Sequence, residues 1–180
     1  MDFYEETLSR EDIFRGRVFD IHRDAVRLPD GKQSFREVVE HSGGVCIAAV
    51  DDERGIYLVE QYRYPFGELT LEVAAGRLEP GEDPLDAAVR ELSEETGLTA
   101  KDMKKVGVFY SSPGFLSEKL HLYLATGLTA GRQHLDEGEF LRVKRMPLSE
   151  AVDKVIFDEI ADGKTKTLVL LADRLINKKD

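Results

Sequence analysis

Three glutamates and an arginine stand close together in the stretch RELSEETG, at positions 90–97. At about 100° per residue, Glu91, Glu94 and Glu95 would fall within about 100° of one another on a helix. Carboxylates at such spacing repel by roughly 0.2–0.5 kcal/mol per pair, and Arg90 stands one turn before Glu94. A solvated acidic helix face would have this composition. The alternative is a cradle for hard divalent cations, which prefer carboxylate oxygens and keep water or phosphate as further ligands.

The residues around these glutamates predict a helix that begins near residue 84. Asp83 suits the N-cap position, and Pro84 suits the first helical turn. Gly97 is placed to end the helix in a left-handed conformation. Apolar residues recur at helical spacing and predict the face that packs against the protein: Leu85, Ala88, Val89 and Leu92. On this assignment the three glutamates lie on a flank away from the core.

The pattern of specific residues at set spacings begins before the predicted helix, at Gly76. From Gly76 to Leu98 the chain reads GRLEPGEDPLDAAVRELSEETGL, with five residues between Gly76 and Glu82 and seven between Glu82 and Arg90. If each of the seven specified residues has a chance of roughly one in twelve, the probability that all of them match by chance at a given start position is about 10⁻⁸. These residues resemble the Nudix box, G-x5-E-x7-R-E-U-x-E-E-x-G-U with U apolar, and every specified position matches. The resemblance implies a Nudix hydrolase, an α/β/α sandwich with a mixed central sheet that splits a nucleoside diphosphate linked to another group.

The resemblance also implies roles for individual residues. The expected ligands of Mg²⁺, or of Mn²⁺ in its place, are carboxylates and one backbone carbonyl: Glu91, Glu95, the assisting Glu94 and the carbonyl of Ala75. Arg90 is expected to orient the glutamates. Glu82 would either hold the geometry of the loop and helix or bind metal through water.

Composition limits the class of protein. With 180 residues the chain suits one domain with a sizeable core and a small appendage. No run approaches the length of a membrane span and the N-terminus is too acidic for a signal peptide, so we expect a cytoplasmic protein that binds no membrane. The single cysteine, Cys46, lies in the apolar run VCIAAV and fits a reducing compartment. A net charge of −10 argues against nucleic-acid binding and leaves anion binding to local arginines and metal ions.

The rest of the chain predicts two domains, 1–42 and 43–180. The first alternates apolar and polar residues around the hairpin signal PDGK at 29–32. It predicts a small antiparallel β subdomain with strands at about 11–16, 17–28 and 33–41. The second predicts a central sheet over 43–75, strands at about 104–110 and 119–126, and helices at about 148–155 and 165–176.

Residues on both sides of the box narrow the resemblance to the ADP-ribose pyrophosphatases. The stretch EQYRYPFGELTLEVAAGRLEPGED resembles their approach to the box, and Pro113, in SSPGF, stands sixteen residues after Gly97. A proline near that distance is associated with this subfamily, although SPG alone is also a simple turn. In this subfamily the N-terminal strands resemble a subdomain that reaches across a dimer. We therefore expect a homodimer that acts on ADP-ribose, with Pro113 and Gly114 at the substrate.

Two arginines are expected on the substrate, because the planar fork of a guanidinium pairs well with phosphate oxygens. By resemblance they are Arg36, in FREVVEH, and Arg63, in EQYRY. Either would instead form a surface ion pair if Glu37 or Glu60 is its partner. Four aromatic residues are candidates to stack on adenine, although the alternation around them also suits core positions: Phe35, Tyr62, Tyr64 and Phe66.

The polar stretch LDEGEFLRV, at 135–143, resembles the acidic loop that supplies the catalytic glutamate in ADP-ribose pyrophosphatases. Glu137 is the first choice for the base and Glu139 the second, since a loop shift of one or two residues would exchange them. A solvated acidic turn would contain the same residues. The base would take a proton from the attacking water, and ADP-ribose would yield AMP and ribose 5-phosphate.

Other functions fit parts of this pattern. A pyrophosphatase for another nucleoside diphosphate sugar, such as GDP-mannose, would differ only in the pocket for the nucleobase. A non-catalytic module that senses ADP-ribose would have a degraded box and an attached DNA-binding domain, and the sequence shows neither. The QYRY and SPG features disfavour hydrolysis of oxidised nucleoside triphosphates.

Overall fold

The computed structural model describes residues 3–178, which divide into two compact units. One unit contains the described residues up to Gly43 together with Tyr110–Lys119. The other contains Gly44–Phe109 and the described residues from Leu120 onward. The segment 110–119 thus belongs with the N-terminal strands, although it comes late in the chain. The two domains expected at 1–42 and 43–180 stay a prediction about how the chain is organised.

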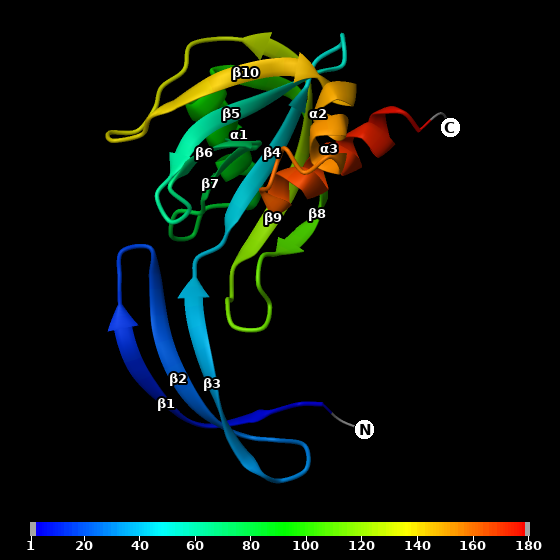
Figure 1. Ribbon diagram of the computed structural model, residues 1–180. Helices are drawn as coiled ribbons and strands as arrows, with labels where there is room; N and C mark the ends of the chain where they lie inside the picture. The colour runs from blue at the N-terminus through cyan, green and yellow to red at the C-terminus, as the bar shows by residue number, and fades with distance from the viewer. Residues whose placement is uncertain (1–2, 179–180) are drawn as a thin grey trace. The chain divides into compact units, whose positions relative to one another are not determined.

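The N-terminal unit contains a three-stranded antiparallel sheet in the order β1-β2-β3 (Figure 1). Its strands are β1, Glu6–Arg15; β2, Phe19–Arg27; and β3, Gln33–His41. The first strand begins at residue 6 rather than near residue 11 as predicted. Two register shifts, between Thr7 and Ser9 and between Asp12 and Phe14, interrupt the pairing of β1 with β2. Such bulges break the alternation of apolar and polar residues that identifies a strand in a sequence.

The second unit is organised around a seven-stranded sheet in the order β10-β5-β4-β9-β8. Two short strands lie off this path, β6 paired with β5 and β7 paired with β4. The central strand β4 is antiparallel to β5 and β7 and parallel to β9, so the sheet is mixed as predicted. The strands are β4, Gly44–Val50; β5, Gly55–Arg63; β6, Glu68–Glu72; β7, Ala74–Arg77; β8, Leu98–Tyr110; β9, Lys119–Ala130; and β10, Leu141–Pro147.

In residues 3–178, three helices cover the two faces of this sheet (Figure 1). They are α1, Pro84–Thr96; α2, Leu148–Ile156; and α3, Gly163–Ile176. Alternate residues of β4 point to opposite faces. Val45, Ile47 and Ala49 share a core with α1, whereas Cys46, Ala48 and Val50 share a core with α2 and α3. The predicted α/β/α sandwich is therefore confirmed. In the described part of the chain, every helix is too short or too polar to cross a membrane.

The buried face of α1 differs from the prediction. Leu85 and Val89 are 42% and 50% exposed. Ala88 and Leu92 are buried as predicted, and Ala87 and Glu95 complete the buried face. Glu95 stands three residues after Leu92 and seven after Ala88, so helical spacing brings it onto the same face. Apolar periodicity alone could not show that a glutamate belongs to the buried face.

Candidate active site

The ends of α1 agree with the local signals in the sequence. Asp83 is the N-cap, and its side chain accepts a hydrogen bond from the amide of Leu85 at 2.8 Å. Pro84 opens the helix, where its missing N–H costs nothing. Gly97 closes the helix with a φ of 70°, in the left-handed region that glycine adopts readily. These ends fix which side chains α1 presents to the sheet.

Arg90 is the centre of the acidic cluster on α1. Its Nε and Nη2 donate to the two carboxylate oxygens of Glu82 at 2.9 and 3.0 Å. Its Nη1 donates to Glu91 and Glu94 at 2.7 and 2.9 Å. The hydrogen bond to Glu82 is the main cause that raises the pKa of Arg90 above its ordinary value. Because Glu82 also accepts from the amide of Glu79, Arg90 joins the preceding loop to the helix.

Gly76 allows a carboxylate to lie directly against strand β7. A Cβ atom at this position would stand 1.8 Å from Oε1 of Glu91. Any side chain would therefore displace that carboxylate. The first glycine of the box is needed for this close approach of backbone and side chain.

Glu95 is buried beneath the cluster, with 4% of its surface exposed. Its Oε2 accepts a hydrogen bond from the amide of Ala75 at 2.9 Å. Burial raises the pKa of Glu95 to about 8 despite this hydrogen bond, and the charges of Glu91 and Glu139 contribute to the rise. Burial also raises the pKa of Glu91, although its hydrogen bond with Arg90 opposes the rise. Two carboxylates thus share a site in which negative charge is poorly solvated.

The cluster suits a divalent cation in its chemistry. Among residues 3–178, no three His, Cys, Asp or Glu side chains are grouped as ligands of one metal ion. Arg90 forms ion pairs with Glu91 and Glu94. The donors are nevertheless the hard oxygens that Mg²⁺ and Mn²⁺ prefer, and a cation would relieve the repulsion between Glu91 and Glu95. The residues present therefore fit the metal that the box implies.

The electrostatics of the helix end favour a cation as well. The last turn of α1 contains Glu94 and Glu95 and no basic residue. Two acidic side chains thus stand at the negative end of the helix dipole, where negative charge is unfavourable.

The loop at 131–140 is hydrogen-bonded to the C-terminal end of α1. Three hydrogen bonds join them: the amide of Gly131 to the carbonyl of Gly97 at 2.6 Å, the amide of His134 to the carbonyl of Glu94 at 3.0 Å, and the side-chain amide of Gln133 to the carbonyl of Glu95 at 2.6 Å. The last carbonyls of a helix lack partners within it, and this loop supplies them. A Cβ atom on Gly97 would stand 2.7 Å from the Gln133 nitrogen. Sequence reasoning missed Gln133, because no local pattern links it to a helix that ends at residue 96.

This loop carries both candidate bases, Glu137 and Glu139, and both are exposed. The charge of Glu139 is among the main causes that raise the pKa values of Glu91 and Glu95, whereas the charge of Glu137 is among the main causes for neither. Of the two candidates, Glu139 therefore has the stronger electrostatic effect on the acidic cluster.

Arg63, near the end of β5, forms a bidentate ion pair with Glu72 of β6. Its Nε and Nη2 donate to the two carboxylate oxygens, each at 2.7 Å. The partner is not Glu60, because the register places Glu60 opposite Arg142 on β10 and the two form an ion pair. The Arg63 side chain is 39% exposed, and the charge of Glu95 contributes to raising its pKa. Its guanidinium is thus both accessible and within the field of the acidic cluster.

Three other predicted substrate residues belong to the N-terminal unit. Arg36 donates through Nε to Glu5 at 2.8 Å, so its partner is not Glu37. Consecutive residues of a strand point to opposite faces, and Glu37 follows Arg36 directly on β3. Pro113 and Gly114 are exposed in the segment between β8 and β9. Their contacts with substrate stay predictions.

The four aromatic candidates are surface residues, so the alternative that placed them in the core is wrong. Each is more than half exposed: Phe35, Tyr62, Tyr64 and Phe66. The guanidinium of Arg23 lies over the ring of Phe35, 5.7 Å from its centroid. Phe35 and Tyr62 lie on solvent-exposed positions of β3 and β5, whereas Tyr64 and Phe66 lie in the turn between β5 and β6.

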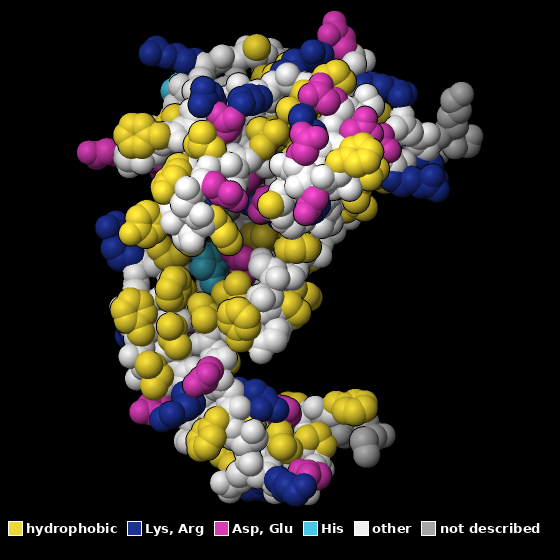
Figure 2. All heavy atoms as spheres, in the orientation of Figure 1, with side chains coloured by type: hydrophobic (Ala, Val, Ile, Leu, Met, Phe, Trp, Pro, Cys, Tyr) yellow, Lys and Arg dark blue, Asp and Glu magenta, His cyan; other side chains and the backbone are white. Residues whose placement is uncertain are grey.

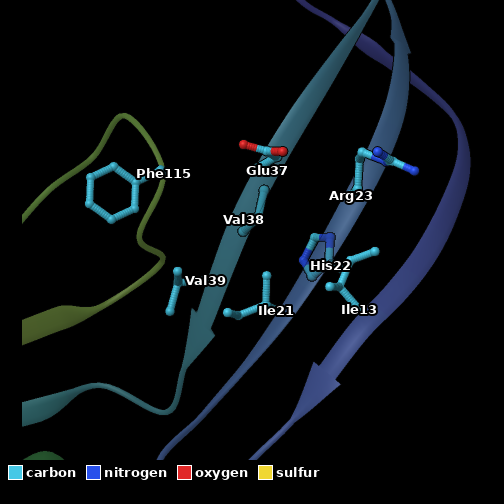
Figure 3. Close-up of a pocket in the computed structure, with 8 residues that line it drawn as sticks. All are labelled: Ile13, Ile21, His22, Arg23, Glu37, Val38, Val39 and Phe115. Carbon is cyan, nitrogen blue, oxygen red and sulfur yellow. The ribbon is translucent and has the colours of Figure 1, made fainter.

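The N-terminal unit contains a hollow of about 400 Å³ (Figure 3). Ile13, Ile21 and Val39 contribute to its largely apolar wall, and Phe115 closes it from the segment between β8 and β9. The buried His22 also lines it, and its Nδ1 lies 3.0 Å from Oδ1 of Asp24. The hollow is lined by none of the predicted catalytic or metal-binding residues.

Comparison with known families identifies the class. The NUDIX domain matches residues 40–168, and the nucleoside diphosphate sugar hydrolase N-terminal domain matches residues 5–39. The chain therefore belongs to the NUDIX family, which confirms the resemblance read from the box.

Individual relatives match along most of the chain. The ADP-ribose pyrophosphatase of Bacillus subtilis (strain 168) is 45% identical over 163 residues, which cover 89% of this chain and 88% of that protein. The methanol dehydrogenase activator of Bacillus methanolicus is 44% identical over 165 residues, which cover 91% and 89%. A crystal structure of ADP compounds hydrolase has a TM-score of 0.84 at 24% identity, covers 96% of this chain and 94% of that one, and shows the shared fold.

Proposed function

We propose that the chain hydrolyses the diphosphate of ADP-ribose to AMP and ribose 5-phosphate with Mg²⁺, or with Mn²⁺ in its place. The observation that carries the proposal is the carboxylate cluster of α1, in which Arg90 donates to Glu91 and the carboxylate of Glu95 is buried. The 45% identity to a protein named ADP-ribose pyrophosphatase supports the choice of substrate.

Glu91, Glu95 and Glu94 are the carboxylates that would hold the metal, and the carbonyl of Ala75 is the further ligand proposed. When bound, divalent ions neutralise a diphosphate and lower the pKa of water. Arg90 limits the movement of Glu91 and Glu94 through its hydrogen bonds to both. The amide of Ala75 holds one oxygen of Glu95, and the other oxygen is left for a ligand.

Glu139 is the proposed base, with Glu137 as the alternative. Its charge acts on both Glu91 and Glu95, and its loop is fastened to the end of α1. In the proposed reaction this carboxylate takes a proton from water, whose oxygen attacks one phosphorus as the other phosphate leaves. No covalent intermediate with the protein is required.

Arg63 is the arginine proposed to contact the diphosphate. Glu72 holds one edge of its guanidinium, and the remaining N–H groups are available to phosphate oxygens. Arg36, Pro113 and Gly114 are proposed as further substrate contacts.

We also propose a cytoplasmic homodimer. Hydrophobic side chains gather over part of the N-terminal sheet (Figure 2), and Ile13, Phe14 and Phe19 are among its exposed residues. Exposed apolar groups of this kind are typical of surfaces that associate.

A substrate panel tests the proposal. The protein is incubated with Mg²⁺ and ADP-ribose, GDP-mannose or other nucleoside diphosphate derivatives in ¹⁸O-labelled water, and products are identified by mass spectrometry. We expect ADP-ribose to yield AMP and ribose 5-phosphate, with ¹⁸O in the phosphate of one of these two products. Preferential cleavage of GDP-mannose would support the alternative substrate, and no cleavage of any compound would support a sensing module.

Substitution tests the proposed metal platform. Glu95→Gln should remove most turnover while the circular dichroism spectrum is unchanged. Glu150→Gln, an exposed position on α2, is the matched control and should keep the wild-type rate. Wild-type turnover by Glu95→Gln would refute the assignment of α1 as the metal platform.

A further inference from the structure

A buried carboxylate with three donors lies beside the proposed site. Glu72 is 1% exposed. It accepts two hydrogen bonds from Arg63, one from the Thr70 hydroxyl at 2.6 Å, and one from the Nζ of Lys164. Hydrogen bonds from charged donors to a buried carboxylate are among the stronger polar interactions in proteins. Glu72 thus joins Arg63, on β5, to Lys164 at the start of α3, and Lys164 stands 92 residues after Glu72 in the chain.

Lys164 occupies a position that disfavours a lysine. It lies in the first turn of α3, at the positive end of the helix dipole, and only 14% of its side chain is exposed. Desolvation also opposes its charge, but the charges of Glu72 and Asp162 outweigh this effect and raise the pKa of Lys164. Its Nζ forms ion pairs with Glu72 and, at 2.9 Å, with Asp162. A residue that contradicts local preference while making specific buried contacts is a candidate for a functional role.

The network controls one edge of Arg63. Its Nε and Nη2 are fixed on Glu72, so the plane of the guanidinium follows the plane of that carboxylate. Lys164 fixes the carboxylate in turn, because it binds Oε2 from the α3 side. Without Lys164, Glu72 would lose a cation that defines its orientation. Arg63 would then still have Glu72 as its hydrogen-bond partner, but Glu72 would no longer be held in one orientation.

We propose that Lys164 is a positioning residue that orients the Arg63 guanidinium towards the diphosphate by holding Glu72. The consequence for substrate binding rests on the proposed function. Lys164 itself touches neither the α1 glutamates nor, in this proposal, the substrate. A merely structural link between α3 and the sheet would instead affect stability without acting through Arg63.

A double-mutant cycle separates the two roles. Lys164→Met removes the charge while keeping much of the side-chain volume, and the N-cap hydrogen bond that the amide of Thr165 donates to Asp162 is left in place. We expect the KM for ADP-ribose to rise about tenfold with kcat within about threefold, because binding in ground and transition states is lost equally. In an Arg63→Ala background, Lys164→Met should raise KM no further. Equal increases in both backgrounds would overturn the proposal.

Two further variants serve as controls for the double-mutant cycle. Lys164→Arg keeps the charge and the donors, so we expect it to recover most of the KM. Lys166→Met is the matched control, since Lys166 lies on the same helix in an ion pair with the exposed Asp158, and it should leave KM unchanged. A Lys164→Arg variant as impaired as Lys164→Met, with the wild-type melting temperature, would contradict the role assigned to the charge.

A measurement without substrate makes the test independent of the enzyme activity. The Nε–Hε signal of Arg63 is assigned by its absence in Arg63→Ala, and its order parameter is measured by nitrogen-15 relaxation. We expect a rigid group in the wild type and an order parameter below about 0.6 in Lys164→Met. If no compound of the panel is cleaved, the proposed function fails while this measurement still decides the positioning role. An Arg63 side chain that stays rigid in Lys164→Met overturns the inference.

Discussion

Replacing Glu72 by glutamine gives a quantitative test of the buried ion-pair network. Burial alone would raise the pKa of Glu72, but the donors Arg63, Lys164 and Thr70 outweigh it and lower the pKa from 4.5 to about 2. At 1.36 kcal/mol per pH unit, this difference corresponds to roughly 3 kcal/mol of stability. Glutamine keeps the shape of the side chain but leaves Arg63 and Lys164 facing a neutral amide. We therefore expect Glu72→Gln to lower the free energy of unfolding by about 3 kcal/mol at pH 7.

The pH dependence has a definite sign. Because the folded-state pKa of Glu72 is lowered, its contribution is fully present above pH 4.5 and is lost as the pH falls towards 2. The difference between wild type and Glu72→Gln should shrink by about 2 kcal/mol between pH 7 and pH 3. The measurement is urea unfolding followed by circular dichroism at both pH values.

An exposed position on the same strand provides the control. Glu68→Gln should change the unfolding free energy by no more than about 0.5 kcal/mol at either pH. A difference between Glu72→Gln and wild type that is equal at pH 7 and pH 3 would refute the reasoning, since the network would then contribute nothing that depends on carboxylate ionisation.

Three further predictions concern the site. Glu139→Gln should lower kcat by about 10²–10⁴-fold and Glu137→Gln by less than about threefold, as measured by AMP release; the reverse ranking would move the base. Gly76→Ala should abolish most turnover without unfolding the protein, because its Cβ would stand 1.8 Å from Glu91; a fully active variant would contradict the proposed close packing. Gln133→Ala should lower kcat more than it lowers the melting temperature, since it frees the loop that carries Glu139; unchanged kinetics would show that the backbone hydrogen bonds hold the loop alone.

The fold could be predicted largely because its signals are local. Asp83 and Gly97 act through their own backbone neighbourhoods, so the bounds of α1 follow from a few residues. The apolar run of β4 is buried on both faces, and an uninterrupted apolar stretch is typical of such a strand. The start of β1 was harder to place because bulges remove the period of two. The association of segment 110–119 with the N-terminal strands depends on backbone hydrogen bonds between Val39 and that segment, which no local pattern indicates.

The site was predictable where spacing within one helix decides it. Arg90 and Glu94 are four residues apart on one helix, so their ion pair follows from helical geometry. The contacts that link distant segments did not follow. Lys164 meets Glu72 across 92 residues, and a lysine near the start of a helix gives no sign of its partner. Electrostatic complementarity of this kind is visible only once the sheet has brought the segments together.

The acidic end of α1 has a consequence for the evolution of this chain. Glu94 and Glu95 oppose the helix dipole, and Glu95 is also buried, so both reduce the stability of the protein when no cation is bound. Substitutions that remove these charges would make the folded chain more robust while removing its metal ligands. Selection for stability alone would thus erode the site, so the acidic turn is a trade-off between robustness and activity. A screen for thermostable variants without metal should find its gains there first.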